Sequence, residues 1–197
     1  MGTIESRRST RQYAPDEVPR EIVRCILEAG ILAPSGKNRQ PWHFVVSLRD
    51  EKRSRMVKNA RDRINRLIQI HPSRNDLHMT LETLEIMASV PVVVYVLYES
   101  DSEMISSDDA SWCLAATNRE ALDIMAIGAA VENMLLKAEE LGLGSLWCGD
   151  VLYAYREFAA EMKDDAVLLS AICFGYKLRE TNGNSSRRPL EQTCEYI

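Results

Sequence analysis

The feature that most constrains this chain is an unbroken apolar run at Val90–Tyr98, which reads V-P-V-V-V-Y-V-L-Y. It is rich in β-branched residues and shows no polar alternation, which is typical of a strand buried on both faces. Such a strand must lie in a sheet that is covered on each side by other parts of the chain. The remaining sequence therefore has to supply two covering layers.

Helical periodicity supplies candidates for both layers. The predicted helices are 19–33, 50–70, 76–88, 117–141 and 153–162; the other predicted strands are 42–48, 145–148 and 167–174, with a short strand near the C-terminus. Helices and strands mixed in this way predict an α+β fold in which helices cover a small central sheet. No linker or repeat divides the 197 residues, so we expect one domain, 1–197.

The longest predicted helix begins at a capping box, Thr117-Asn118-Arg119-Glu120. It ends near Leu141, and Gly142 is expected to form a left-handed cap. Because 121–131 is apolar on nearly every face, this helix is expected to be buried, either in the core or in a subunit interface. Composition favours the two interpretations equally.

Charge and residue counts exclude several classes of protein. The net charge of −5 argues against binding to nucleic acid or to an anionic membrane, and no apolar run approaches the roughly 20 residues of a membrane span. Five separated cysteines without a C-x-x-C motif, and an N-terminus without an apolar signal region, predict a reduced, cytoplasmic protein.

Catalytic motifs are excluded in the same way. The three histidines lack the spacing of a zinc site or a Ser-His triad, and no P-loop is present. Gly142-Leu143-Gly144 follows a helix and precedes a strand, the reverse of the order that a dinucleotide fingerprint requires.

The N-terminal segment Arg7-Arg8-Ser9-Thr10-Arg11 is the first candidate site. Three guanidinium groups and two hydroxyls can surround a phosphate with charge-assisted hydrogen bonds. Taken alone, such a cluster is more often a solvated basic terminus. Arg187-Arg188 is a second basic pair with the same two interpretations.

Two further stretches combine small residues with amide groups. In Pro34–Trp42, P-S-G-K-N-R-Q-P-W, the backbone can approach a flat ligand closely, and Gly144–Asp150, G-S-L-W-C-G-D, places an aromatic ring beside a glycine. The alternatives are a plain helix-to-strand connection and ordinary core residues. Cys148 has no basic neighbour in sequence to lower its pKa, which argues against a nucleophile.

Together, and in this order, the segments resemble the nitroreductase family of FMN enzymes. The resemblance rests on S-R-R-S-T-R-x-Y at Ser6–Tyr13, A-P-S-G-K-N-R-Q-P-W-H-F at Ala33–Phe44, the long helix running into G-L-G-S-L-W-C-G at Gly142–Gly149, and R-R-P-L-E at Arg187–Glu191. It implies an α+β fold with a small, mostly antiparallel central sheet covered by helices, and an intimate homodimer with one FMN at each interface.

The resemblance also assigns residues to the cofactor. The FMN phosphate and ribityl chain are expected to contact Arg7, Arg8, Ser9, Arg11, Arg187 and Arg188; the partner subunit is expected to contribute Pro34, Ser35, Gly36 and Asn38; and a backbone stretch is expected to cross the flavin at Trp147, Cys148 and Gly149. We also expect Arg11 to stabilise the negative charge that reduction places on the N1–C2=O edge.

The implied activity is hydride transfer from NADH or NADPH through flavin N5 to a nitroaromatic, a quinone or a related small-molecule acceptor. It requires no metal and no catalytic acid or base from the protein. The alternatives are a specialised flavoenzyme of the same fold, either a reductive dehalogenase or a flavin-fragmenting enzyme, and a non-catalytic flavin-binding module. Residues 59–76 match the family poorly, and Asn65 is the candidate there for a flavin contact; acceptor choice is expected to reside in 98–117.

Overall fold

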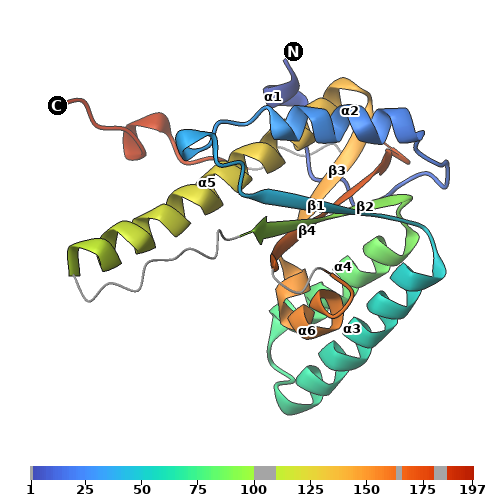
Figure 1. The fold of residues 1–197 in the computed structure, drawn as a ribbon. Helices are drawn as coiled ribbons and strands as arrows, with labels where there is room; N and C mark the ends of the chain where they lie inside the picture. The colour runs from blue at the N-terminus through green and yellow to red at the C-terminus, as the bar shows by residue number, and fades with distance from the viewer. Residues whose placement is uncertain (1, 100–109, 163–165, 180–185) are drawn as a thin grey trace.

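The computed structural model describes residues 2–99, 110–162, 166–179 and 186–197, with the backbone alone for 110–118. Its elements, in chain order, are α1 (Thr3–Ser6), α2 (Arg20–Ile31), η1 (Gly36–Asn38), β1 (Trp42–Leu48), α3 (Glu51–Ile70), α4 (Asn75–Ser89), β2 (Val92–Glu99), α5 (Ala110–Glu140), β3 (Leu143–Cys148), η2 (Asp150–Ala154), α6 (Tyr155–Ala159), β4 (Ala166–Tyr176) and η3 (Leu190–Gln192). Figure 1 shows a sheet between two groups of helices. The prediction of an α+β fold is confirmed.

The sheet has four strands in the order β1-β2-β4-β3, and every neighbouring pair is antiparallel. Strand β2 pairs on both sides, and Val92 to Tyr98 are all buried, as the apolar run predicted. The register of β2 against β4 shifts between Val96 and Leu97. Strands β1 and β3 form the outer edges.

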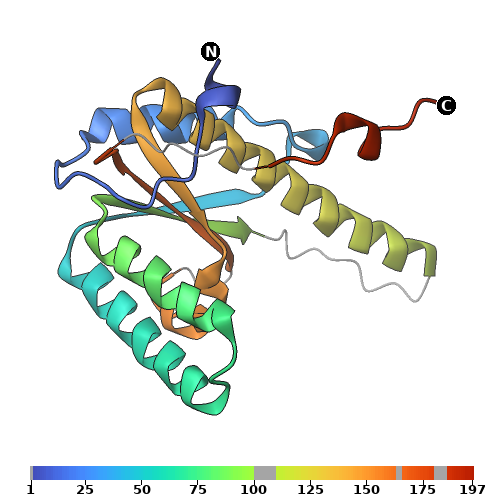
Figure 2. The same ribbon diagram turned by 180° about the vertical axis from the view of Figure 1, so that it is seen from behind.

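Two apolar clusters cover the two faces of the sheet. Helices α3 and α4, with η2 and α6, pack on one face around buried residues such as Tyr95 and Phe158. Helices α2 and α5 pack on the other face around residues such as Val94 and Met134. Figures 1 and 2 show these groups on opposite sides of the sheet.

Helix α5 begins earlier than the sequence indicated. It starts at Ala110, so the capping box at Thr117 lies inside the helix and that predicted boundary is wrong. The residues between them include no glycine or proline, and nothing in their backbone preference stops a helix from continuing upstream. The other end is as predicted, because Gly142 has a φ of 76°.

The core interpretation of α5 is confirmed for part of its length, and the interface interpretation stays a prediction for the rest. Ala130, Val131 and Met134 are fully buried in the core of the chain. Towards the N-terminal end, Leu122, Ile124 and Met125 remain 43–69% exposed. That end of the helix projects beyond the sheet in both views (Figures 1 and 2).

Two smaller predictions were also wrong. The predicted helix 153–162 is divided into η2 and α6. Among the described residues 186–197 there is a short 3-10 helix, η3, in place of a strand. The outer edge of β3 is occupied by the N-terminal segment, so the C-terminal residues could pair there only by displacing it.

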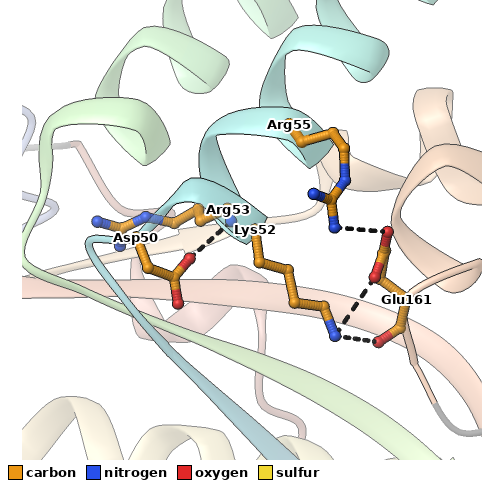
Figure 3. Close-up of polar contacts among 5 residues, drawn as sticks. All are labelled: Asp50, Lys52, Arg53, Arg55 and Glu161. Atoms are coloured by element: carbon orange, nitrogen blue, oxygen red, sulfur yellow. Dashed lines mark hydrogen bonds and ion pairs between the residues drawn. The ribbon is translucent and has the colours of Figure 1, made fainter.

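Polar contacts fix helix α3 at its start (Figure 3). The Asp50 carboxylate caps the helix by accepting a 2.8 Å hydrogen bond from the Arg53 backbone N–H. Lys52 and Arg55 each lie 3.4 Å from the Glu161 carboxylate just beyond α6. The Arg53 side chain turns inward and is 1% exposed, and burial lowers the pKa of its guanidinium.

Candidate functional site

The N-terminal segment lies along the outer edge of β3, the edge that does not pair with β4. Ser9 forms a parallel bridge with Ser145, and the Thr10 backbone N–H donates a 2.8 Å hydrogen bond to the Ser145 carbonyl. Thr10 is 1% exposed, and a Cβ at Gly144 would lie 2.5 Å from its hydroxyl. Gly144 therefore permits an approach that any larger residue would block.

This pairing brings Arg11 to the end of β3. A cavity of about 190 Å³ opens there. Its lining joins the N-terminal segment, α4 and the β3–η2 connection: Arg11, Met79, Glu82, Thr83, Ile86, Leu146, Trp147, Cys148 and Asp150. Segments that are distant in the sequence but were assigned to one site, at Arg11 and at Trp147–Cys148, therefore lie together.

Trp147 separates this cavity from a second hollow. Trp147 is 47% exposed, and its indole N–H donates a 2.9 Å hydrogen bond to the Ser170 hydroxyl. The second hollow measures about 500 Å³ and lies against α5; its lining is Ile124, Ile127, Gly128, Val131, Trp147, Gly149, Leu169 and Ser170. An aromatic residue fixed by a hydrogen bond thus stands between a polar cavity and an apolar hollow.

Glycines keep this region open. At Gly149 and at Gly128 an added Cβ would meet no atom within 4 Å. The space directly beside the Gly149 backbone is therefore open to a ligand. Open space beside a glycine backbone is compatible with a flavin ring at this turn.

Cys148 contributes no reactive thiol. Its Sγ lies 3.9 Å from the Cys173 Sγ, and both residues are buried. The hydrogen bond with Cys173 and then burial raise the pKa of the Cys148 thiol well above its usual range, and the charge of Arg11 opposes them. A thiol held in its neutral form is a poor nucleophile, as the sequence indicated.

The three arginines of the N-terminal segment have different surroundings. The Arg7 Nε lies 3.8 Å from a Glu132 carboxylate oxygen on α5. Arg8 donates to the carbonyls of Glu5 and Arg7 at 2.6 and 2.8 Å. Arg11 reaches the cavity described above. The assignment of Arg7, Arg8 and Ser9 to a phosphate stays a prediction.

The loop Pro34–Asn38 is anchored elsewhere. Arg39 follows it and forms an ion pair with Asp123 of α5, which is 3% exposed. Lys37, Asn38 and Gln40 have φ of 52°, 56° and 52°, a left-handed conformation that costs roughly 1–2 kcal/mol for a non-glycine residue. None of the described residues lining the two hollows comes from this loop.

Two other predicted groups also lie apart from the cavity. Arg187 and Arg188 belong to an exposed C-terminal segment that extends away from the sheet (Figures 1 and 2). Asn65 is exposed on α3, whereas the helix that lines the cavity is α4. Acceptor choice was placed in 98–117, and residues 100–109 of that range lie outside the described residues.

Sequence reasoning missed the contribution of α4. Met79, Glu82, Thr83 and Ile86 line the cavity, and the Thr83 hydroxyl donates a 2.7 Å hydrogen bond to the Asp150 carboxylate. Helix α4 was predicted, but no motif marks which of its faces meets β3. The four positions recur at helical spacing, which was the one signal available.

Two features are absent from the described ranges. They contain no group of three or more His, Cys, Asp and Glu residues placed to hold a metal ion. No helix in this part of the chain is both long enough and apolar enough to cross a bilayer.

This sheet order, with helices on both faces and an open turn after β3, is the architecture of the nitroreductase fold. It matches a BluB-like flavoprotein from Clostridium difficile with a TM-score of 0.80 and 26% identity, covering 99% of this chain and 97% of that one. A crystal structure from Desulfovibrio desulfuricans, of a protein assigned as a nitroreductase in complex with FMN, matches with a TM-score of 0.71 and 30% identity, covering 99% and 94%.

The sequence match agrees with the fold. The model of the nitroreductase family matches residues 4–176, so the chain belongs to this family. A Methanothermobacter thermautotrophicus protein assigned as an NADH dehydrogenase/NAD(P)H nitroreductase is 30% identical over 149 residues. That match covers 76% of this chain but only 60% of the relative.

Proposed function

We propose that this protein is an FMN-dependent oxidoreductase that takes hydride from NADH or NADPH and passes it to a nitroaromatic, a quinone or a related small acceptor. The carrying observation is the convergence of Arg11, Trp147 and the open Gly149 turn on one end of β3. The solved relative with FMN and the relative assigned as an NAD(P)H nitroreductase support the choice of cofactor and donor.

Each segment of the chain has a role in this proposal. Bound FMN supplies a ring nitrogen, N5, that accepts and donates hydride. Backbone amides at Trp147, Cys148 and Gly149 bind the ring edge, while Arg11 stabilises negative charge at the N1–C2=O edge. Arg7, Arg8 and Ser9 hold the phosphate. No side chain acts as an acid or base.

The proposal includes a homodimer. The exposed apolar residues of α5 and the apolar hollow beside them need a cover, and a second copy of the same helix provides one. Pro34, Ser35, Gly36 and Asn38 would then reach the flavin held by the partner subunit, and Arg187 and Arg188 would contact the FMN phosphate and ribityl chain. Residues 1–197 act as one domain, in the cytoplasm, where thiols such as the exposed Cys25 and Cys194 stay reduced.

Cofactor content tests the proposal directly. The purified protein should be yellow, should release FMN on denaturation, and should bleach when NADH or NADPH is added without oxygen. A protein that takes up no FMN from solution would contradict every flavin-dependent function. A yellow protein that neither nicotinamide reduces would favour the non-catalytic flavin-binding module.

Acceptor profiling separates the remaining functions. Nitroaromatics and quinones should reoxidise the reduced protein in single turnovers. Loss of halide from a halogenated acceptor would identify a reductive dehalogenase. Oxygen-dependent destruction of the bound FMN would identify a flavin-fragmenting enzyme.

A further inference from the structure

Two side chains of opposite charge line the cavity at the end of β3 without pairing. Arg11 comes from the N-terminal segment and Glu82 from α4. Within the described part of the chain, neither side chain makes a hydrogen bond or an ion pair. Opposite charges that share a small cavity but stay apart are both available to a ligand that has an acceptor beside a donor.

The other carboxylates nearby are already engaged. Asp150, also in the cavity, accepts a 2.7 Å hydrogen bond from Thr83. Glu85, one turn along α4 from Glu82, points to α3 and pairs with Arg61 at 2.7 Å. Of the two carboxylates that line the cavity, Glu82 is therefore the one without a hydrogen-bond or ion-pair partner among the described residues.

The cavity is suited to one edge of a flat ring. Its volume of about 190 Å³ is below the roughly 300–1,000 Å³ of sites that enclose a whole ligand. The pyrimidine edge of oxidised flavin presents O2, N3–H and O4, which is an acceptor, a donor and an acceptor. With Arg11 at the N1–C2=O edge, the adjacent group is N3–H, the ring donor that a carboxylate can bind.

We propose that Glu82 accepts a hydrogen bond from flavin N3–H and lowers the reduction potential of the flavin, which is the opposite of the effect of Arg11. This inference rests on the proposed function and deepens it. A carboxylate beside the pyrimidine ring repels the negative charge that reduction places there, whereas the guanidinium of Arg11 attracts it. Glu82 therefore lowers the potential and makes the reduced flavin a stronger reductant.

Variants at Glu82 test this proposal in the full-length protein. Glu82→Gln keeps an oxygen acceptor for N3–H but removes the charge, whereas Glu82→Ala removes both. Glu85→Gln is the matched control, because it removes the same charge from the same helix on a face turned to α3. The measurements are the FMN dissociation constant, the midpoint potential of the bound flavin, and the dissociation constant of an FMN methylated at N3.

The expected results distinguish the effect of the Glu82 hydrogen bond from the effect of the Glu82 charge. Both Glu82 variants should shift the potential to more positive values, and Glu85→Gln should not. Glu82→Ala should weaken FMN binding about tenfold, the usual loss for a hydrogen bond to a charged group, while Glu82→Gln should weaken it less. The native protein should bind FMN more tightly than the N3-methylated flavin, and Glu82→Ala should largely abolish that preference.

One outcome would overturn the role of Glu82, and another would overturn the proposed function. If the variants bind FMN with native potential and native preference over the N3-methylated flavin, Glu82 is not at N3 and the proposed function still stands. If the native protein takes up no FMN, the proposed function itself fails. A circular dichroism spectrum equal to that of the native protein shows that each variant is folded.

Discussion

At the scale of single residues, the five-residue segment that starts at Arg7 contains three arginines that look alike in the sequence and differ in the structure. Arg7 lies near a carboxylate on α5, Arg8 folds back on backbone carbonyls, and Arg11 faces the cavity. The difference follows from the pairing of Ser9 and Thr10 with β3, which fixes where each neighbouring side chain points. The sequence of this segment alone does not predict its pairing with β3.

Removing the Arg11 charge should make the flavin harder to reduce. In Arg11→Ala the negative charge at the N1–C2=O edge loses its cation, so the midpoint potential should become more negative and FMN should bind about 10- to 100-fold more weakly, as expected for a charged hydrogen bond. Spectroelectrochemistry and a fluorescence titration measure the two effects. Arg20→Ala, at the exposed start of α2, is the control. An unchanged potential in Arg11→Ala would remove Arg11 from this role.

Thiol reactivity should divide the cysteines by burial. The pKa of Cys148 is raised by its hydrogen bond with Cys173 and by burial, so at pH 8 its thiol stays protonated in the folded protein. Iodoacetamide should therefore label the exposed Cys25 and Cys194 within minutes, and Cys148 only after unfolding in urea. Peptide mass spectrometry gives the rate at each site. Labelling of native Cys148 as fast as Cys194 would contradict the assigned protonation.

At the scale of elements, sequence reasoning worked where one pattern dominated. The β2 run has few alternatives to a doubly buried strand, and Gly142 has few alternatives to a left-handed cap. The start of α5 was missed because a capping box inside a helix has the same sequence as one that begins it. The role of α4 was missed because tertiary packing, and not its sequence, selects the face that meets the site.

The buried ion pair between Arg39 and Asp123 should stabilise the connection between η1 and α5. Asp123→Ala leaves a largely buried guanidinium without its partner, so the free energy of unfolding should fall by about 3 kcal/mol, the lower end for breaking such a pair. Glu28→Ala is the control, since it breaks an exposed pair with Arg24 and should leave stability almost unchanged. Urea denaturation measures both. Equal effects in the two variants would mean that the buried pair does not anchor the loop.

At the scale of the whole molecule, one chain shows only part of the predicted site. Arg11 and Trp147–Gly149 lie together, whereas the loop Pro34–Asn38 and the C-terminal Arg187 and Arg188 do not. The resemblance assigned that loop to the flavin of the partner subunit, and the loop lines neither hollow of its own chain. The sequence of one chain does not show which subunit of a symmetric oligomer supplies a given residue to a shared site, because both subunits have the same sequence.

A charge on the exposed face of α5 should dissociate the proposed homodimer. Ile124 is 43% exposed and lines the apolar hollow, so Ile124→Glu should shift the protein from dimer to monomer and reduce FMN retention at the same time. Ile70→Glu places the same charge at a 67% exposed position at the end of α3 and should change neither property. Light scattering and the FMN content of the purified protein give the two results. A native protein that is monomeric with FMN bound would contradict the shared site.

The pairing of Ser9 and Thr10 with β3 has a consequence for how this protein tolerates change. The same few residues that carry the arginines also cover the open edge of a strand, and uncovered edges promote aggregation. A deletion through residue 11 would therefore produce insoluble protein whether or not the arginines matter to the ligand. Edge protection and the proposed cofactor binding thus fall on one segment, and only single side-chain substitutions can tell the two roles apart.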